Sequence, residues 1–326
     1  MIPMVETANQ SAATPADRDL FRVLWQAPAG GTPVSAVRVE YGRHFRRLPH
    51  EEDTIEDAWS AAIASNPRIF DKSKFRLASI VPGGAGVDVT IRLGLTGYKE
   101  YMGTNRLPHK PRNKLAMDGE RVHNDANTHL SNALGCETVL ITSDGQLVLL
   151  RRSSKVATHG GQFNGPSGHP EPSNAAIVDD EPLASTTDTE AVAQRAAVEL
   201  FASVVQEAYE ETNVPLAALS EPRLIGCMAA NDEHGCIGKP DLLFLTRTRL
   251  TAAEVRTQYE QGAEEGWESD RLAFFPQDLD IGPDVHLTPV TLCALAELPR
   301  HLHGHLADAS DAQLRQKLEA ALTRLA

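Results

Sequence analysis

The chain has 326 residues, of which 41% are hydrophobic and 23% are charged, a composition typical of a folded, water-soluble protein. This length favours two domains, and the formal net charge of -13 argues against nucleic acid and anionic membranes as partners. The cysteines form no CxxC pair, residues 1–16 read as a disordered lead without a secretory signal, and no apolar run approaches the ~20 residues that cross a bilayer. We therefore expect a cytoplasmic protein.

A first folded region is expected over residues 17–130. Asp53 and the apolar spacing after it predict a helix, because Asp is a favoured N-cap and apolar residues then recur at helical intervals. Apolar and polar side chains alternate in residues 75–81 and 87–93, on either side of a Pro-Gly-Gly turn. This alternation predicts two strands. Residues 103–130 are rich in His, Lys, Asn and Pro and predict a long loop or linker.

A second folded region, residues 131–300, opens with a hairpin signal. Residues 138–142 and 146–150 are apolar runs on either side of Ser-Asp-Gly. The elements that follow are a polar insertion at about 173–190, a helix over about 191–212, strands at 242–245 and 272–275, a helix near 251–260, and a C-terminal helix within 301–326. No internal repeat is present in the sequence.

Three carboxylates at the end of the predicted 191–212 helix form the most informative motif. Glu207, Glu210 and Glu211 are spaced i, i+3, i+4, so a helix places them on one face. Like charges at this spacing destabilise a helix by roughly a few tenths of a kcal/mol per pair. A divalent cation such as Mg²⁺ would offset this repulsion, because it binds carboxylates together with substrate phosphates. A solvated acidic helix face is the alternative, and spacing alone favours that alternative.

The segment around these carboxylates resembles the end of the Nudix box, G-x5-E-x7-R-E-U-x-E-E-x-G-U. Gln206 replaces the Arg of the box, and Asn213 replaces its last Gly. Gly168 best matches the first Gly, but about 24 additional residues separate it from the acidic cluster. Asn174 occupies the position of the first Glu, and Glu199 is the nearest acidic substitute. The box is therefore interrupted in its first half, whereas its last three carboxylates are intact.

These departures, and most of the chain, resemble an atypical Nudix branch, the eukaryotic UDP-glucose/UDP-galactose pyrophosphatases. The blocks that carry the resemblance outside the acidic cluster are Phe70-Asp71, Lys74–Leu77, Arg92–Tyr98, Gly103–Asn105, Leu150–Ser153, Gly168–Pro172 and Glu199–Val204. The resemblance implies a fold of the α/β class, namely a Nudix α/β/α sandwich with a mixed sheet, preceded by a smaller α+β N-terminal domain. It also implies Mg²⁺-dependent hydrolysis of a UDP-hexose to UMP and hexose 1-phosphate, with Mn²⁺ as an alternative ion.

The resemblance also assigns roles to individual residues by position. Glu207 and Glu211 match metal-binding carboxylates, and Glu210 is expected as a further ligand. Glu268 lies in an acidic loop where Nudix enzymes often place a general base, which completes the expected catalytic set. The residues matched to the nucleotide-sugar pocket are Phe70, Tyr98, Arg152, Ala157, His169 and Glu171, and Asn164 stands where a pocket Asp is expected. Since two of these precede residue 131, the N-terminal domain is expected to contribute to the pocket.

Two further hypotheses are compatible with the sequence. A Nudix hydrolase could act on another nucleoside diphosphate derivative, such as ADP-ribose or a dinucleotide polyphosphate, because no side chain provides an unambiguous code for uracil. A non-catalytic nucleotide-sugar sensor is the third hypothesis, since Gln206 cannot form the ion pair made by the Arg of the box. The intact acidic cluster argues against a sensor. We expect a small-molecule partner, without nucleic acid or membrane, and the sequence gives no indication of the oligomeric state.

Overall fold

The structure of the protein is a computed structural model. It describes residues 20–42, 45, 52–67, 69–154, 156, 158–177, 186–231, 238–263, 268–277 and 285–302. The disordered lead expected at residues 1–16 lies outside the described residues. The C-terminal helix expected within 301–326 also lies outside them, except for its first two residues, which end a short helix, α8 (Pro299–Leu302).

Eight strands form the larger of two sheets, with the order β1-β9-β10-β5-β6-β11, β7 beside β6 and β8 beside β5. Their bounds are β1 Phe21–Gln26, β5 Gly135–Ile141, β6 Gln146–Arg152, β7 Phe163–Asn164, β8 Ser167–Gly168, β9 Arg223–Ala230, β10 Pro240–Arg247 and β11 Ser269–Pro276. β10 runs parallel to β5, and the other pairs are antiparallel, so the sheet is mixed. β1 joins this sheet by pairing with β9, although it lies within the range 17–130.

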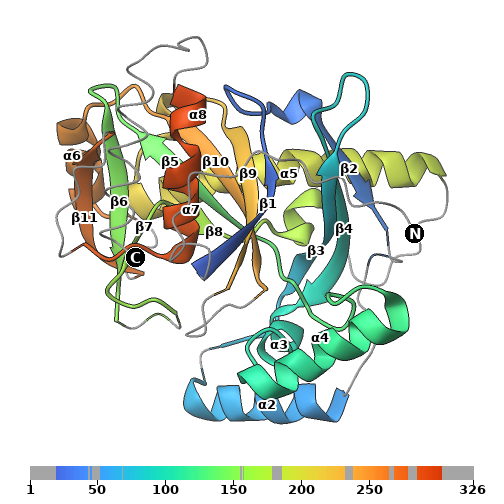
Figure 1. Ribbon diagram of the computed structural model, residues 1–326. Helices are drawn as coiled ribbons and strands as arrows, with labels where there is room; N and C mark the ends of the chain where they lie inside the picture. Colours follow the sequence, from blue (N-terminus) through green and yellow to red (C-terminus); the bar gives the residue numbers. More distant parts are fainter. Residues whose placement is uncertain are drawn as a thin grey trace.

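Helices cover both faces of the large sheet (Figure 1). Side chains alternate between the faces along a strand, so that in β5 Cys136 packs in one apolar cluster and Val139 packs in another. The first cluster includes Leu200 of α5 (Thr186–Thr212), and the second includes Leu295 of α7 (Pro289–Glu297). A third helix, α6 (Ala252–Glu260), begins with the capping box of Thr251 and Glu254. The expected α/β/α sandwich is confirmed.

A smaller, three-stranded sheet has the order β2-β4-β3. Its strands are β2 (Val37–Tyr41), β3 (Ser73–Pro82) and β4 (Val89–Gly97), and β3 and β4 confirm the two strands expected from the sequence. The helices α2 (Glu52–Ser65), α3 (Tyr98–Met102) and α4 (His109–His123) lie together below this sheet in the view of Figure 1.

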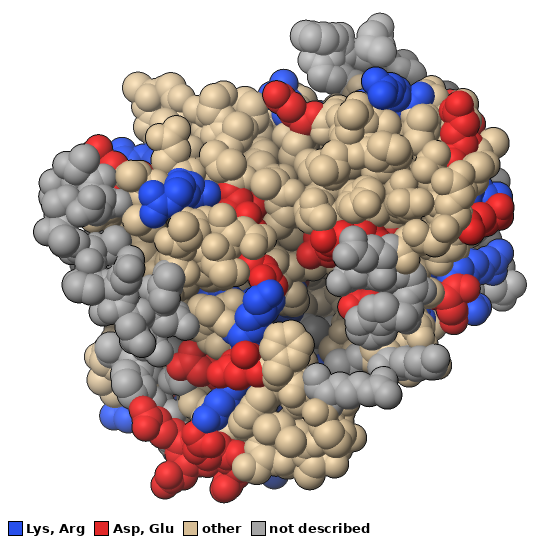
Figure 2. Space-filling model, turned by 180° about the vertical axis from the view of Figure 1, so that it is seen from behind, with Lys and Arg blue, Asp and Glu red and all other residues tan. Residues whose placement is uncertain are grey.

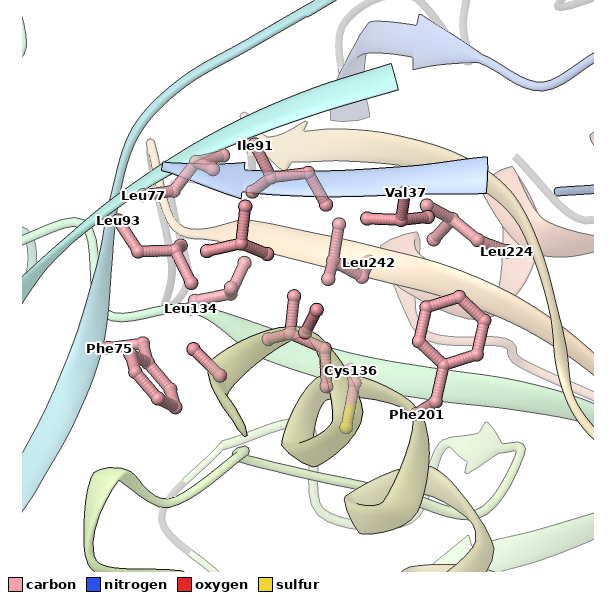
Figure 3. Close-up of a cluster of buried hydrophobic side chains, with 14 of the residues drawn as sticks. Val37, Phe75, Leu77, Ile91, Leu93, Leu134, Cys136, Phe201, Leu224 and Leu242 are labelled. Carbon is pink, nitrogen blue, oxygen red and sulfur yellow. The ribbon is translucent and has the colours of Figure 1, made fainter. Parts of the chain in front are cut away.

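One hydrophobic core joins the two sheets (Figure 3). Val37, Phe75 and Ile91 of the small sheet pack in the same cluster as Phe201 of α5 and Leu242 of β10. Each fully buried side chain of this size contributes roughly 1.5–3 kcal/mol of transfer free energy. The N-terminal region is therefore attached to the large sheet by shared buried side chains.

The long loop expected over residues 103–130 is wrong, because α4 occupies the middle of this range. Pro111 lies in the first turn of α4, where backbone N–H groups have no partner within the helix, so a proline costs little there. Leu115 is buried, and Asn124 ends the helix in the left-handed conformation with φ 54°. The polar composition of the segment masked this helix.

Both ends of the polar insertion expected at about 173–190 belong to regular elements. A 3-10 helix spans Pro172–Ala175, Ala175 and Ile177 are buried, and α5 begins at Thr186 rather than near residue 191. Two other 3-10 helices are Val34–Ala36 and Leu216–Ala218. Among the described residues, no helix is both long enough and apolar enough to span a membrane.

Candidate active site

The candidate site is organised by a split between β5 and β6. The two strands pair only next to their turn, at Leu140–Ile141 with Leu147–Val148, and confirm the predicted hairpin. Further along, β8 pairs with β5 and β7 pairs with β6, so the segment Phe163–Gly168 lies in the gap. The segment provides hydrogen-bond partners for backbone N–H and C=O groups that the diverging strands would otherwise leave unpaired. Asn164 is buried in this segment, and its Nδ2 donates a hydrogen bond to Ser167 Oγ at 2.7 Å.

Two of the three clustered carboxylates of α5 face this segment. A Cβ added to Gly168 would overlap the Glu207 carboxylate, so the missing side chain makes room for it. Glu211 is only 4% exposed, and its Oε2 has no hydrogen-bond partner in the described structure. Burial raises the pKa of Glu211 well above its usual range, and the charges of Glu207 and Glu268 raise it further. Glu207, Glu211 and Glu268 therefore form an acidic cluster, although they come from two distant segments.

A cation borders the acidic cluster. The charge of Arg152, at the end of β6, lowers the pKa of Glu211 and of Glu268 and opposes the effect of burial. Arg152 Nε donates to the Thr158 carbonyl at 3.0 Å, which orients the guanidinium group. Glu268 is held nearby because its carbonyl accepts a hydrogen bond from the Ser153 backbone N–H at 2.7 Å. Burial raises the pKa of Glu268, which makes its carboxylate more basic.

The structure separates Glu210 from this cluster. Its Oε1 accepts a hydrogen bond from Gln206 Nε2 at 2.6 Å on the exposed side of α5. The residue that replaces the Arg of the box therefore binds a carboxylate of the same helix. Of the three stacked glutamates, Glu207 and Glu211 face the gap between β5 and β6.

A second group of charges lies where the small sheet reaches the loop after β8. Glu171 forms ion pairs with Lys72, which directly precedes β3, and with Lys74 of β3, the latter at 3.3 Å. The Glu171 backbone N–H donates to Glu199 Oε1 at 2.9 Å, and Asn174 Nδ2 donates to the same oxygen at 3.2 Å. Glu199, the acidic substitute in the interrupted box, thus holds the loop that carries Glu171.

His169 lies between these two groups of charges. Burial lowers its pKa well below 6.5, and the charges of Lys239, Lys74 and Arg152 lower it further. His169 is therefore a neutral imidazole near pH 7, with one donor and one acceptor nitrogen. Seen from behind, acidic and basic side chains border a hollow in the middle of the molecule (Figure 2).

The aromatic residues expected to bind the nucleotide lie on the N-terminal side. Phe70 is 69% exposed, in the short segment that precedes β3. Tyr98 is half-buried at the start of α3, with its ring centroid 6.2 Å from that of Trp59, and its N–H donates to the Lys72 carbonyl at 3.2 Å. Both therefore lie close in sequence or space to the lysines that pair with Glu171. Ala157 lies outside the described residues.

The side chains present fit a divalent cation that takes part of its ligands from substrate or water. In the described part of the chain, no group of three or more His, Cys, Asp or Glu side chains is placed to hold a metal ion by itself. Glu207 and Glu211 are nevertheless close enough to raise the proton affinity of Glu211, and Glu211 keeps one buried oxygen without a partner. Mg²⁺ is commonly bound in this way, by one or two carboxylates together with phosphates and waters.

The sequence analysis assigned no role to Lys239 or Asp241. The two form an ion pair at the start of β10, beside Gly135 of the neighbouring β5. The sequence did contain a signal for this ion pair: two opposite charges stand directly before the apolar run Leu242–Leu245, and charges next to a buried strand need partners.

The chain is similar to known proteins over most of its length, although no family model matches it. It is 35% identical over 257 residues to "Uridine diphosphate glucose pyrophosphatase NUDT22" of Homo sapiens, covering 77% of this chain and 82% of that protein. The protein of the same name from Bos taurus is 36% identical, with 77% and 85% covered. "Nudix hydrolase 9" of Arabidopsis thaliana is 30% identical over 268 residues, with 77% and 81% covered.

Solved structures add little to these sequence relationships. The MutT protein from Methanosarcina mazei aligns over 51% of this chain and 90% of its own, with 14% identity and a TM-score of 0.29, which is too low to carry an argument. The sequence relatives, together with the sandwich and the paired carboxylates of α5, lead to one conclusion: the chain belongs to the Nudix hydrolase family, in the group that includes NUDT22.

Proposed function

We propose that this Nudix hydrolase cleaves UDP-glucose and UDP-galactose to UMP and hexose 1-phosphate, with Mg²⁺ or Mn²⁺ as its metal ion. The proposal rests on the names of the relatives and on one structural observation. A buried carboxylate oxygen without a partner, on Glu211, lies in a cluster of acids that is bordered by Arg152. The partner is a small nucleotide sugar, and the negative net charge and free buried cysteines suit a cytoplasmic enzyme that binds neither nucleic acid nor membrane.

Glu207 and Glu211 would hold the metal ion, whereas Glu210, which accepts a hydrogen bond from Gln206 on the exposed side of α5, is not proposed as a ligand. When bound, the ion supplies positive charge that neutralises the pyrophosphate and orients the attacking water. Glu268 would take the proton from this water, and burial, which raises the pKa of its carboxyl, makes the carboxylate a stronger base. The water oxygen bonds to phosphorus, and the bond to the bridging oxygen breaks.

The remaining site residues would bind the substrate. The guanidinium group of Arg152 suits phosphate oxygens, because it offers several donors in a fixed plane. His169, as a neutral imidazole, donates to phosphate, and Glu171 accepts from sugar hydroxyls. Asn164 would line the pocket as well, and Ala157, which lies outside the described residues, is assigned to the pocket by its matching position alone. Phe70 and Tyr98 of the N-terminal domain would bind the nucleotide, where one of them can stack on the uracil.

The test is to incubate the purified full chain with UDP-glucose, in Mg²⁺ or in EDTA, and to separate the products by ion-exchange chromatography. UMP and glucose 1-phosphate should form only with the metal ion. ADP-ribose and a dinucleotide polyphosphate serve as competing substrates. Faster turnover of either would replace the UDP-sugar proposal, and thermal stabilisation by UDP-glucose without turnover would indicate a sensor.

A further inference from the structure

Two lysines, Lys74 and Lys239, lie near His169, in the region where the small sheet reaches the loop after β8. Lys74 belongs to β3 of the small sheet, whereas Lys239 directly precedes β10 of the large sheet. Both charges, together with that of Arg152, lower the pKa of His169. The side chains of Lys74 and Lys239 are each only 13% exposed. Such burial is costly for an ammonium group, so these positions need an explanation beyond surface charge.

Strand register explains how Lys239 reaches this position. β8 pairs with β5 so that Gly168 lies opposite Cys136; His169 directly follows Gly168, and Gly135 directly precedes Cys136. On the other side of β5, Asp241 of β10 lies opposite Gly135. A Cβ at Gly135 would overlap Lys239 Nζ and the Asp241 carboxylate, so the glycine makes room for this ion pair. The ammonium group therefore lies near His169.

A carboxylate orients each lysine without using all of its donors. Lys239 pairs with Asp241, and Lys74 pairs with Glu171 at 3.3 Å. An ammonium group has three N–H donors, so donors remain for a ligand. Arg152 adds a third positive charge near His169, in a chain of net charge -13. An anion with several oxygen acceptors is the ligand that fits such a group.

We infer that Lys74 and Lys239 complete, with Arg152, a subsite for the diphosphate of the substrate, so that one essential cation comes from each sheet. This inference rests on the proposed function and adds two phosphate-binding residues to it. The diphosphate would then lie between the acidic cluster that holds the metal ion and the two lysines. Neutral His169 lies among the cations as a donor that does not add to their mutual repulsion.

The test compares three substitutions in the full chain: Lys74→Met, Lys239→Met and, as the matched control, Lys72→Met. Lys72 pairs with the same Glu171 as Lys74 does, but its side chain is 44% exposed. With UDP-glucose and Mg²⁺, we expect the KM to rise roughly 10- to 100-fold for Lys74→Met and Lys239→Met, as for a lost hydrogen bond to a charged group. The control should change KM by less than about threefold, because an exposed ion pair contributes little.

A second measurement separates phosphate binding from a structural role. Inhibition by UDP should weaken in Lys74→Met and Lys239→Met, whereas inhibition by uridine should not, and Lys239→Arg should restore part of the binding. Equal weakening of UDP and uridine would overturn the inference. If Lys239→Met does not fold because Asp241 is left unpaired, the double variant Lys239→Met with Asp241→Asn removes both charges and takes its place.

Failure of the proposed function can be distinguished from failure of this inference. If the unmodified protein hydrolyses UDP-glucose and the two variants retain its KM, the subsite is wrong and the function stands. If the unmodified protein does not hydrolyse UDP-glucose, calorimetry with inorganic pyrophosphate still tests the subsite. Pyrophosphate binding that is lost in Lys239→Met would support the subsite, and no binding to the unmodified protein would overturn it.

Discussion

The acidic and the basic parts of the candidate site are assembled in different ways. Glu207 and Glu211 lie one turn apart on a single helix, α5, so a local sequence pattern brings them together. Lys74 and Lys239 belong to different sheets, and both come near His169 because the small sheet packs onto α5 through β2 and because β10 pairs with β5. The acidic part therefore depends on local helix geometry, whereas the basic part depends on the shared core and on strand register. The two parts should respond differently to mutation.

The largest expected effect is a loss of stability when the core beside Lys74, in the basic part of the site, is disrupted. Phe75, next to Lys74 in β3, is fully buried in the core shared by the two sheets. Phe75→Ala should lower the free energy of unfolding by roughly 3–5 kcal/mol, since it removes a large buried ring and leaves a cavity. Urea denaturation followed by circular dichroism and fluorescence measures the loss. Separate transitions for the two sheets, rather than one weakened transition, would contradict a common core.

Next in size is the loss of the buried acid. Glu211→Gln should reduce kcat with UDP-glucose by roughly 10²–10³-fold, the range found when a group that stabilises transition-state charge is removed. The substitution should not lower the thermal midpoint, because a buried carboxylate surrounded by like charges is replaced by a neutral side chain. Steady-state kinetics and a thermal melt test both statements. The exposed Glu221→Gln serves as control, and an active Glu211→Gln enzyme would remove the acidic cluster from the mechanism.

Two glycines allow the acidic and basic parts to be perturbed separately. Gly168→Ala introduces a Cβ that overlaps the Glu207 carboxylate, and Gly135→Ala introduces one that overlaps Lys239 and Asp241. We expect Gly168→Ala to lower kcat by roughly tenfold or more and Gly135→Ala mainly to raise KM, by about the same factor. In both cases flexible side chains can shift, so stability should change little. Gly84→Ala is the control, because no atom lies within 4 Å of its added Cβ.

If the two glycine variants change kcat and KM in the same proportion, the division of the site into two parts is wrong. An unchanged KM in Gly135→Ala would specifically remove Lys239 from substrate binding. Thermal midpoints measured alongside the kinetics exclude general unfolding as the cause.

The last prediction concerns the pH dependence of stability, which involves a buried carboxyl of β5. Glu137 of β5 is 1% exposed, and burial raises its pKa to about 8 from 4.5. The folded protein therefore binds this proton more tightly than the unfolded chain, so stability falls as pH rises from about 4.5 to about 8, by up to ~1.4 kcal/mol per pH unit. Glu137→Gln should flatten this part of the stability curve, as measured by urea denaturation at several pH values. An unchanged slope in the variant would show that Glu137 ionises normally.

The periodicity of the apolar residues was sufficient to predict several elements near the site. The hairpin of β5 and β6, the strand pair of β3 and β4, and the carboxylates on α5 each depend on neighbouring residues, and each was expected from spacing alone. The helix α4 was missed because its residues are mostly polar and include Pro111, so packing through Leu115 decides its formation. Propensity is a weak guide when tertiary packing overrides it.

The sequence by itself determined the acidic face of α5 and the match to the end of the Nudix box, because both depend on residues close together in the chain. Helical spacing alone did not distinguish Glu210 from Glu211, since it cannot say which of two adjacent carboxylates turns toward Ser167, although the resemblance matched Glu211 to a metal ligand. It also gave no reason to bring Lys74 and Lys239 near the same histidine, His169. Those contacts depend on how the small sheet packs onto α5 and on the register of β10, β5 and β8. Long-range packing and register are decided by the burial of a common core, which no local window of sequence contains.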